Sequence, residues 1–138
     1  MSVQIDARGP RFSAAITTVV LAVALVTSNV WVAAFQAVVF AIGAIRGPQF
    51  TPYAFIFKRV VKPLLRGEVV TEDSRPPQFA QTVGFLFALV GLLGAAIGSV
   101  PVFSIAVGFA LAAAFLNSVF NYCLGCEMYL LVLRIRTR

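Results

Sequence analysis

The sequence predicts an all-α integral membrane protein in which four transmembrane helices form two related hairpins within one domain, residues 1–138. Composition is the first observation: hydrophobic residues make up 60% of the chain and charged residues 12%, whereas soluble domains have roughly 45–50% and about 25%. The second observation is that two long blocks, 12–45 and 79–122, contain no charged residue. Each block exceeds the roughly 20 residues that cross the hydrocarbon layer, so each is expected to cross twice.

The same composition excludes several classes of protein. A chain this apolar is not disordered, and its two cysteines are too few for a disulfide-stapled secreted fold. The absence of histidine excludes His-based catalytic triads and nearly all zinc sites that use histidine. A net charge of +6 on so apolar a chain points to anionic lipid as the partner and away from nucleic acid.

Turn-forming residues divide each block into two helices. Thr27, Ser28 and Asn29 interrupt the first block, and the Gly-Ser-Val-Pro run at 98–101 interrupts the second. The expected spans lie near 10–26 and 30–45 in hairpin one (10–45), and near 78–98 and 102–133 in hairpin two (78–133), with a loop at 46–77 between the hairpins. The first two spans are short, so either local thinning of the bilayer or snorkelling of side chains to the interface must accommodate them.

All eleven lysines and arginines fall on one side of the predicted membrane. Two precede the first span, six lie in the loop at 46–77 and three follow the last span, while the two short opposite turns contain none. Cytoplasmic loops of membrane proteins are enriched in these residues. We therefore expect a multi-pass protein of the cytoplasmic membrane with both termini in the cytoplasm.

The two predicted hairpins share sequence features. Each opens with an Arg-x-Pro-x-Phe pattern, at 8–12 and 75–79, and five of eight positions agree between 33–40 and 113–120. Both copies would run from the inside to the outside and back, which makes the repeat a parallel one. The alternative to a duplication is chance agreement among a few apolar residue types.

The central loop carries the signals of a short amphipathic helix. Thr51 and Pro52 are typical of an N-cap followed by the first helical position. Four cations then recur at helical spacing among apolar residues: Lys58, Arg59, Lys62 and Arg66. We expect this helix to lie on the inner membrane surface with the four cations on anionic headgroups. The alternative is a short core helix packed under the bundle.

Cys123 and Cys126 form a C-x-x-C pair near the inner end of the fourth span, roughly 31 Å along the helix from its outer end. In such a pair one thiol attacks a disulfide and the other resolves the mixed disulfide. In an unbroken helix Glu127 shares a face with both thiols and would accept the proton of the attacking thiol. At the C-terminal end of a helix the negative pole of the dipole raises the pKa of a thiol. A break at Gly125 that started a new helix would reverse this effect. Two questions are left open: whether the helix breaks at Gly125, and which of the two cysteines attacks. Two other roles for the pair are also left open: a structural pair, and half of a metal site.

Two amides in the fourth span also require a partner. Asn117 and Asn121 are four residues apart, so they share a helix face. Asparagine within a membrane helix usually hydrogen-bonds a neighbouring helix. We expect Gln36 of the second span to be the partner.

Taken together, these residues resemble a bacterial integral-membrane family catalogued as domain of unknown function 4395. The likeness covers nearly the whole chain and is carried by the stretches 6–12, 36–40, 46–48, 75–81, 115–117 and 123–129. The resemblance implies a four-helix membrane protein with a C-terminal cysteine pair. It also implies thioredoxin-like or rhodanese-like partner proteins, and hence thiol or sulfane-sulfur handling.

We therefore expect a thiol–disulfide or persulfide redox component of the membrane that needs no bound cofactor. Cys123 and Cys126 would be the redox pair and Glu127 the proton acceptor. Two other classes of function stay open: a non-catalytic scaffold or subunit with a structural cysteine pair, and a carrier of soft ions or sulfur compounds. The lipid bilayer is the expected partner in each case, and a homo-oligomer is left open.

Overall fold

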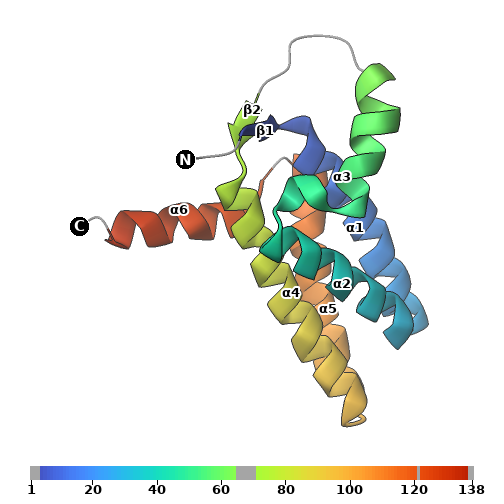
Figure 1. Ribbon diagram of the computed structural model, residues 1–138. Helices are drawn as coiled ribbons and strands as arrows, with labels where there is room; N and C mark the ends of the chain where they lie inside the picture. Colours follow the sequence, from blue (N-terminus) through green and yellow to red (C-terminus); the bar gives the residue numbers. More distant parts are fainter. Residues whose placement is uncertain (1–3, 65–70, 121, 137–138) are drawn as a thin grey trace.

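Figure 1 shows the computed structural model of the chain, which describes residues 4–64, 71–120 and 122–136. Most of these residues are helical, and the longer helices are α1 (Arg8–Thr27), α2 (Val30–Ile45), α4 (Arg75–Ala96), α5 (Val100–Phe120) and α6 (Leu124–Arg136). Helices α1, α4 and α5 are long and apolar enough to cross a membrane. Helix α2 is apolar but has 16 residues, which is about 24 Å of helix. The all-α prediction is confirmed, and three of the predicted spans have the length that a crossing needs.

Shorter elements complete the described structure. They are a 3₁₀ turn at Pro48–Phe50, α3 (Pro52–Ile56), a π-helical stretch at Phe57–Val61, a second 3₁₀ turn at Lys62–Leu64, and the strands β1 (Gln4–Asp6) and β2 (Thr71–Asp73). The pieces from Pro52 to Leu64 follow one another without interruption and form one helical run, which we call the loop helix. The helix predicted in the central loop is therefore present.

The bundle core lies between α1, α2, α4 and α5. Helix α1 packs most extensively on α5, and α2 on α4. The core side chains are largely small or of medium size: Leu21, Ala24, Ala37, Phe40, Ala88, Phe103, Val107 and Ala110. Small residues let helix backbones approach closely, and a Cβ on Gly84 would lie only 2.7 Å from the ring of Phe40. Large apolar side chains such as Val26, Leu93 and Phe109 face outward, as expected of helices surrounded by lipid.

Both predicted turns between helices are present. Ser28 ends α1 with a positive φ of 51°, and the Oδ1 of Asn29 accepts the N–H of Trp31 at 2.9 Å, which caps α2. Gly98 ends α4 with a φ of 78°. A positive φ is the usual way to close a helix C-terminus, and it favours glycine.

Strands β1 and β2 pair antiparallel at one end of the bundle, with Ile5 opposite Glu72. The residue after each strand leads into a long helix, and each strand ends in an aspartate that binds an arginine two residues on. Asp6 accepts the backbone N–H of Arg8 at 3.0 Å and its guanidinium at 2.9 Å. Asp73 does the same with Arg75, at 3.0 Å and 2.7 Å. In both cases the side-chain hydrogen bond to arginine lowers the pKa of the aspartate.

The predicted helix at 102–133 is not continuous, and this corrects the sequence interpretation. Helix α5 ends at Phe120, and α6 begins at Leu124 and runs crosswise to α4 and α5, away from the bundle (Figure 1). The N–H of Tyr122 donates to the carbonyl of Leu116, six residues back, at 3.1 Å, whereas a continuing α-helix bonds each N–H to the carbonyl four residues back. The chain therefore turns before Gly125, not at it.

Candidate functional site

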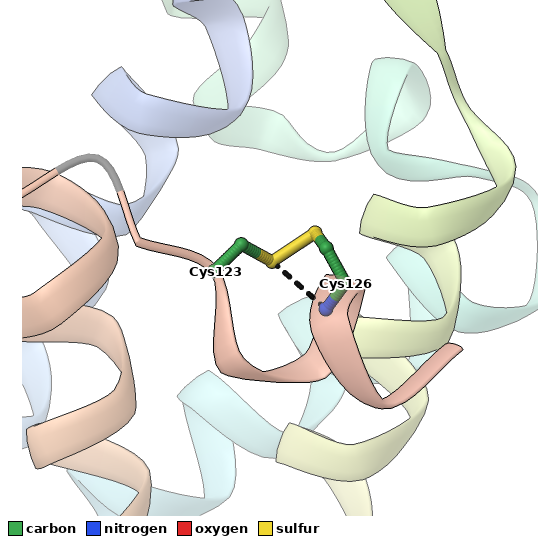
Figure 2. The surroundings of a disulfide bond; sticks show 2 residues. All are labelled: Cys123 and Cys126. Carbon is green, nitrogen blue, oxygen red and sulfur yellow. Dashed lines mark hydrogen bonds between the residues drawn. A yellow bond between two sulfur atoms is a disulfide. The ribbon is translucent and has the colours of Figure 1, made fainter. Parts of the chain in front are cut away.

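The cysteine pair lies at the junction where α5 ends and α6 begins. Cys123 and Cys126 form a disulfide with a Cα–Cα distance of 5.1 Å (Figure 2). Both residues are half-buried, so the pair is neither enclosed in the core nor fully open to its surroundings. The structure thus joins the two cysteines that the C-x-x-C spacing predicts as a pair.

Cys123 is the N-cap of α6. Its Sγ accepts the backbone N–H of Cys126 at 3.1 Å, as the dashed line in Figure 2 shows, and its carbonyl accepts the N–H of Glu127 at 3.0 Å. Serine, threonine, aspartate and asparagine usually fill this position, and they do so through the same kind of bond. The positive end of the helix dipole therefore lies at the sulfur of Cys123. An unbroken fourth span would have placed the pair near a negative end instead.

Helix α6 is held in place by α4. A Cβ on Gly125 would lie 2.5 Å from both Cα and Cβ of Ala80, so only glycine permits this approach without movement. One turn further on, the ring of Tyr129 contacts that of Phe79, with centroids 5.7 Å apart. Gly125 therefore serves as a packing contact that sets the position of the disulfide relative to α4.

The first half of the chain contains the same local arrangement without cysteines. Thr51 is the N-cap of α3, and its Oγ1 accepts the N–H of Ala54 at 3.2 Å. Three residues beyond Ala54, the ring of Phe57 contacts that of Phe12 at 5.7 Å, as Tyr129 contacts Phe79 in the second half. The cysteines thus occupy the positions that threonine and alanine occupy in the first half.

A second correspondence concerns the helix C-termini. The guanidinium of Arg11, near the start of α1, donates to the carbonyls of Ser118 and Val119 at 2.9 and 3.3 Å. The amide of Gln78, near the start of α4, donates to the carbonyl of Ala44 at 2.8 Å. Arg11 of α1 thus binds carbonyl groups in the last turn of α5, and Gln78 of α4 binds one in the last turn of α2. In both cases the contact joins the two halves of the chain and satisfies carbonyls that have no partner within their own helix.

Glu127 lies in the first turn of α6 and is exposed. An acidic residue at this position interacts favourably with the positive end of the helix dipole. It follows Cys126 directly in the sequence, so a carboxylate is available near the pair.

The predicted lipid-contacting cations lie on the loop helix and differ in their surroundings. Lys58 donates to the backbone carbonyl of Gln49 at 3.0 Å, and Lys62 lies 3.8 Å from a carboxylate oxygen of Asp6. Arg59 is exposed, and Arg66 lies outside the described residues. The loop helix buries Tyr53, Ala54 and Phe57 against the bundle and exposes Phe55, Ile56, Val60 and Leu64. It therefore has one face on the bundle and another that is apolar and cationic.

Gln36 has partners other than those expected. Its Oε1 accepts the hydroxyl of Tyr53 at 2.6 Å, and its Nε2 donates to Thr17 at 3.5 Å. All three residues are buried, and burial raises the pKa of Tyr53 to about 12. Asn117 does not take this place, and Asn121 lies outside the described residues. Tyr53 was not among the residues predicted from the sequence, although its position two residues after the Thr51 N-cap was a signal that it belongs to a helix.

Among the residues that the structure describes, no group of three or more His, Cys, Asp or Glu side chains gathers where a metal ion could be held. Comparison with known proteins finds no match among curated proteins and none among solved structures. The sequence profile of the family described as Domain of unknown function (DUF4395) matches residues 5–134. Because this match covers nearly the whole chain, the chain belongs to that family.

Proposed function

We propose that this chain is a multi-pass protein of the cytoplasmic membrane that exchanges electrons with a partner protein through Cys123 and Cys126. The observation that carries the proposal is the place of the pair at the start of α6, where the Sγ of Cys123 accepts a backbone N–H at 3.1 Å. A helix N-terminus stabilises negative charge, and the thiolate is the reactive form of cysteine. In the reduced pair, Cys123 is therefore the attacking residue.

The exchange is a two-electron reaction in two steps. The thiolate of Cys123, having passed its proton to Glu127, attacks one sulfur of a partner disulfide and releases the other partner sulfur as a thiolate. Cys126 then attacks the sulfur of Cys123, which closes the Cys123–Cys126 disulfide and releases the second partner sulfur. Both protons pass to the partner, which leaves as a dithiol. The same steps in reverse oxidise a partner dithiol.

The chemistry requires a partner with its own sulfur pair. The chain has two cysteines in all, so no third cysteine of this chain can exchange with the pair, and the exchange proposed here is with a sulfur outside it. The family resemblance favours a thioredoxin-like protein, whose disulfide or dithiol fits this exchange. An approach from the cytoplasm follows from the membrane orientation that the lysines and arginines predict.

In the membrane, α1, α2, α4 and α5 would provide four crossings. The exposed apolar side chains of these helices support contact with lipid. The matched contacts around Thr51 and Cys123, and around Arg11 and Gln78, support two related halves that arose by duplication. Helix α2 is short for a crossing, which local thinning of the bilayer would accommodate.

A second candidate function follows from the first half of the chain. Thr51 caps α3 in the same way without any cysteine, which favours a structural role for the cap formed by Cys123 as the second candidate. A scaffold in which the disulfide only fastens the start of α6 would show the same geometry. The two functions differ in whether the cysteine pair undergoes thiol–disulfide exchange with a partner protein.

The decisive test is to trap the mixed disulfide in cells that express the full chain. Cys126→Ala removes the resolving thiol, so Cys123 should stay bound to its partner and give a shifted band on a non-reducing gel. Cys123→Thr keeps the cap and removes the attacking thiol, so it should trap nothing. If the two variants behave alike and trap no partner, the scaffold function is the better one.

A further inference from the structure

A cavity of about 240 Å³ lies between β1, the start of α1 and the loop helix. Its walls are partly apolar and include Ile5, Pro48 and Phe57. It is separate from the cysteine pair, which lies at the corresponding place in the second half of the chain. The cavity is large enough for a small polar group such as a phosphate ester with a short carbon chain.

Three charged side chains line the cavity: Asp6, Lys58 and Lys62. The ammonium group of Lys58 donates to the backbone carbonyl of Gln49, and that of Lys62 lies 3.8 Å from Asp6. The carboxylate of Asp6 also binds the guanidinium of Arg8 at 2.9 Å. Arg8 and Lys62 therefore share the carboxylate of Asp6, while Lys58 has no carboxylate partner among the described residues, so the three cations outnumber the one anion around the cavity. Each ammonium group has three donors; Lys58 uses one on Gln49 and Lys62 faces Asp6 as an ion pair, so both have donors left for a ligand.

We propose that this cavity binds the phosphate headgroup of an anionic glycerophospholipid, with phosphate oxygens accepting hydrogen bonds from Lys58 and Lys62. Lysine binds phosphate as a point charge and needs no planar geometry. The ring of Phe55 lies next to the ammonium group of Lys58, with its centroid 5.5 Å from Nζ, and it is exposed, so an apolar side chain is available there to the acyl chains of the same lipid. The loop helix thus provides a defined site for one lipid in addition to general attraction to the membrane surface.

The inference rests on the membrane location in the proposed function and is independent of the redox chemistry. It also separates two roles among neighbouring cations. All three side chains are exposed, but Lys58 and Lys62 line the cavity and Arg59 does not. Attraction to a charged surface would depend on all three cations equally, but a headgroup site depends on two of them.

The test uses the purified full chain in nanodiscs of phosphatidylcholine, to which phosphatidylglycerol is added in steps. Bound phosphatidylglycerol is counted by native mass spectrometry. Lys58→Gln and Lys62→Gln should each weaken binding roughly tenfold, because each removes a charged hydrogen-bond donor to phosphate. Arg59→Gln is the matched control, with the same loss of charge one residue from Lys58, and it should leave binding nearly unchanged. Lys58→Arg keeps the charge and should retain binding.

Helicity measured by circular dichroism establishes that each variant is folded before its binding is compared. Equal weakening by all three glutamine variants would overturn the site and leave only surface attraction. Equal occupancy by phosphatidylcholine and phosphatidylglycerol would overturn it as well. Binding of soluble sn-glycerol 3-phosphate that depends on Lys58 and Lys62, without preferential binding of phosphatidylglycerol, would overturn the lipid and assign the cavity to a free phosphate ester. None of these outcomes affects mixed-disulfide trapping by Cys126→Ala, so failure here is distinguishable from failure of the redox proposal.

Discussion

Thr51 and Cys123 occupy the same position in two different helices. Each is an N-cap whose side chain accepts the backbone N–H of the third residue after it, at 3.2 Å from Thr51 Oγ1 and 3.1 Å from Cys123 Sγ. The acceptor in the first half is a hydroxyl oxygen, a common cap. The acceptor in the second half is a sulfur, which is a weaker acceptor but a redox-active atom. Chemistry could therefore be added to an existing structural turn without changing the fold around it.

This relationship predicts that Cys123→Thr leaves α6 as stable as it is in the reduced wild-type chain. Cys123→Val, of similar size but without an acceptor, should lose the cap and lower the free energy of unfolding by about 0.5–2 kcal/mol. Thermal unfolding of the purified chain under reducing conditions measures both. Thr51→Val is the matched variant in the first half and should lose a similar amount. Equal losses for Cys123→Thr and Cys123→Val would show that the sulfur does not act as a cap.

A second prediction concerns the contact that places α6 on α4. Gly125→Ala would put a Cβ 2.5 Å from backbone and side-chain atoms of Ala80, so α6 must move. We expect a loss of about 1–3 kcal/mol in unfolding free energy and a changed rate of reaction of the cysteine pair with a soluble thiol. Gly108→Ala is the control, because a Cβ there meets nothing within 4 Å. It should be neutral or stabilising by up to about 1 kcal/mol. Equal effects of the two substitutions would contradict the packing role of Gly125.

The sequence predicted the helices and the turns between α1 and α2 and between α4 and α5, for a clear physical reason. Uncharged blocks of this length must be helical in a membrane, and Ser28, Asn29 and Gly98 favour the backbone conformations that end or begin a helix. The cation pattern also located the loop helix. These signals lie within short segments, so they can be found without knowing the fold.

The break between α5 and α6 could not be predicted in the same way. Residues 121–123 are Asn, Tyr and Cys, with neither glycine nor proline to mark an end, and periodicity is uninformative where all faces are apolar. Cysteine is also outside the usual set of N-cap residues. The ribbon of β1 and β2 and the bond between Gln36 and Tyr53 join segments far apart in the chain, and only the packed structure brings them together. The cysteine pair was found, but its position at a helix start was not.

The buried hydroxyl of Tyr53 predicts a specific dependence on pH. Burial raises its pKa to about 12, above the value of about 10 for a free tyrosine. The group is neutral in both the folded and unfolded chain below pH 10, so its contribution is fully present there. As the pH rises from about 10 to about 12, the unfolded chain loses this proton and the folded chain does not, so the free energy of unfolding falls. Titration of tyrosinate absorbance should show a step near pH 12 that Tyr53→Phe removes and Tyr122→Phe, the control, retains.

Glu127 provides a test of how the pair is deprotonated. If its carboxylate accepts the proton of Cys123, Glu127→Gln should slow the reaction of the reduced pair with a small disulfide near neutral pH. If its charge only opposes a nearby thiolate, the same substitution should speed the reaction. Stopped-flow kinetics on the reduced chain distinguishes the two. Glu72→Gln, which changes a half-buried carboxylate on β2, is the control and should leave the rate unchanged.

The last prediction concerns membrane orientation, on which both the redox partner and the lipid site depend. The turns at Ser28 and Ser99 carry no charge, whereas every lysine and arginine lies in the other segments. The positive-inside rule then places these two turns outside. A background without cysteines is available in the double variant Cys123→Thr and Cys126→Ala, which copies the first half of the chain. Ser28→Cys and Ser99→Cys in this background should react with a membrane-impermeant maleimide in intact cells. Arg59→Cys, on the exposed face of the loop helix, should react only after lysis.

Labelling in the reverse pattern would place the cysteine pair outside the cytoplasm and require a partner from that side. Labelling of only one of the two turns would show that one hairpin does not cross, and α2, with its 16 residues, would be the first helix to re-examine.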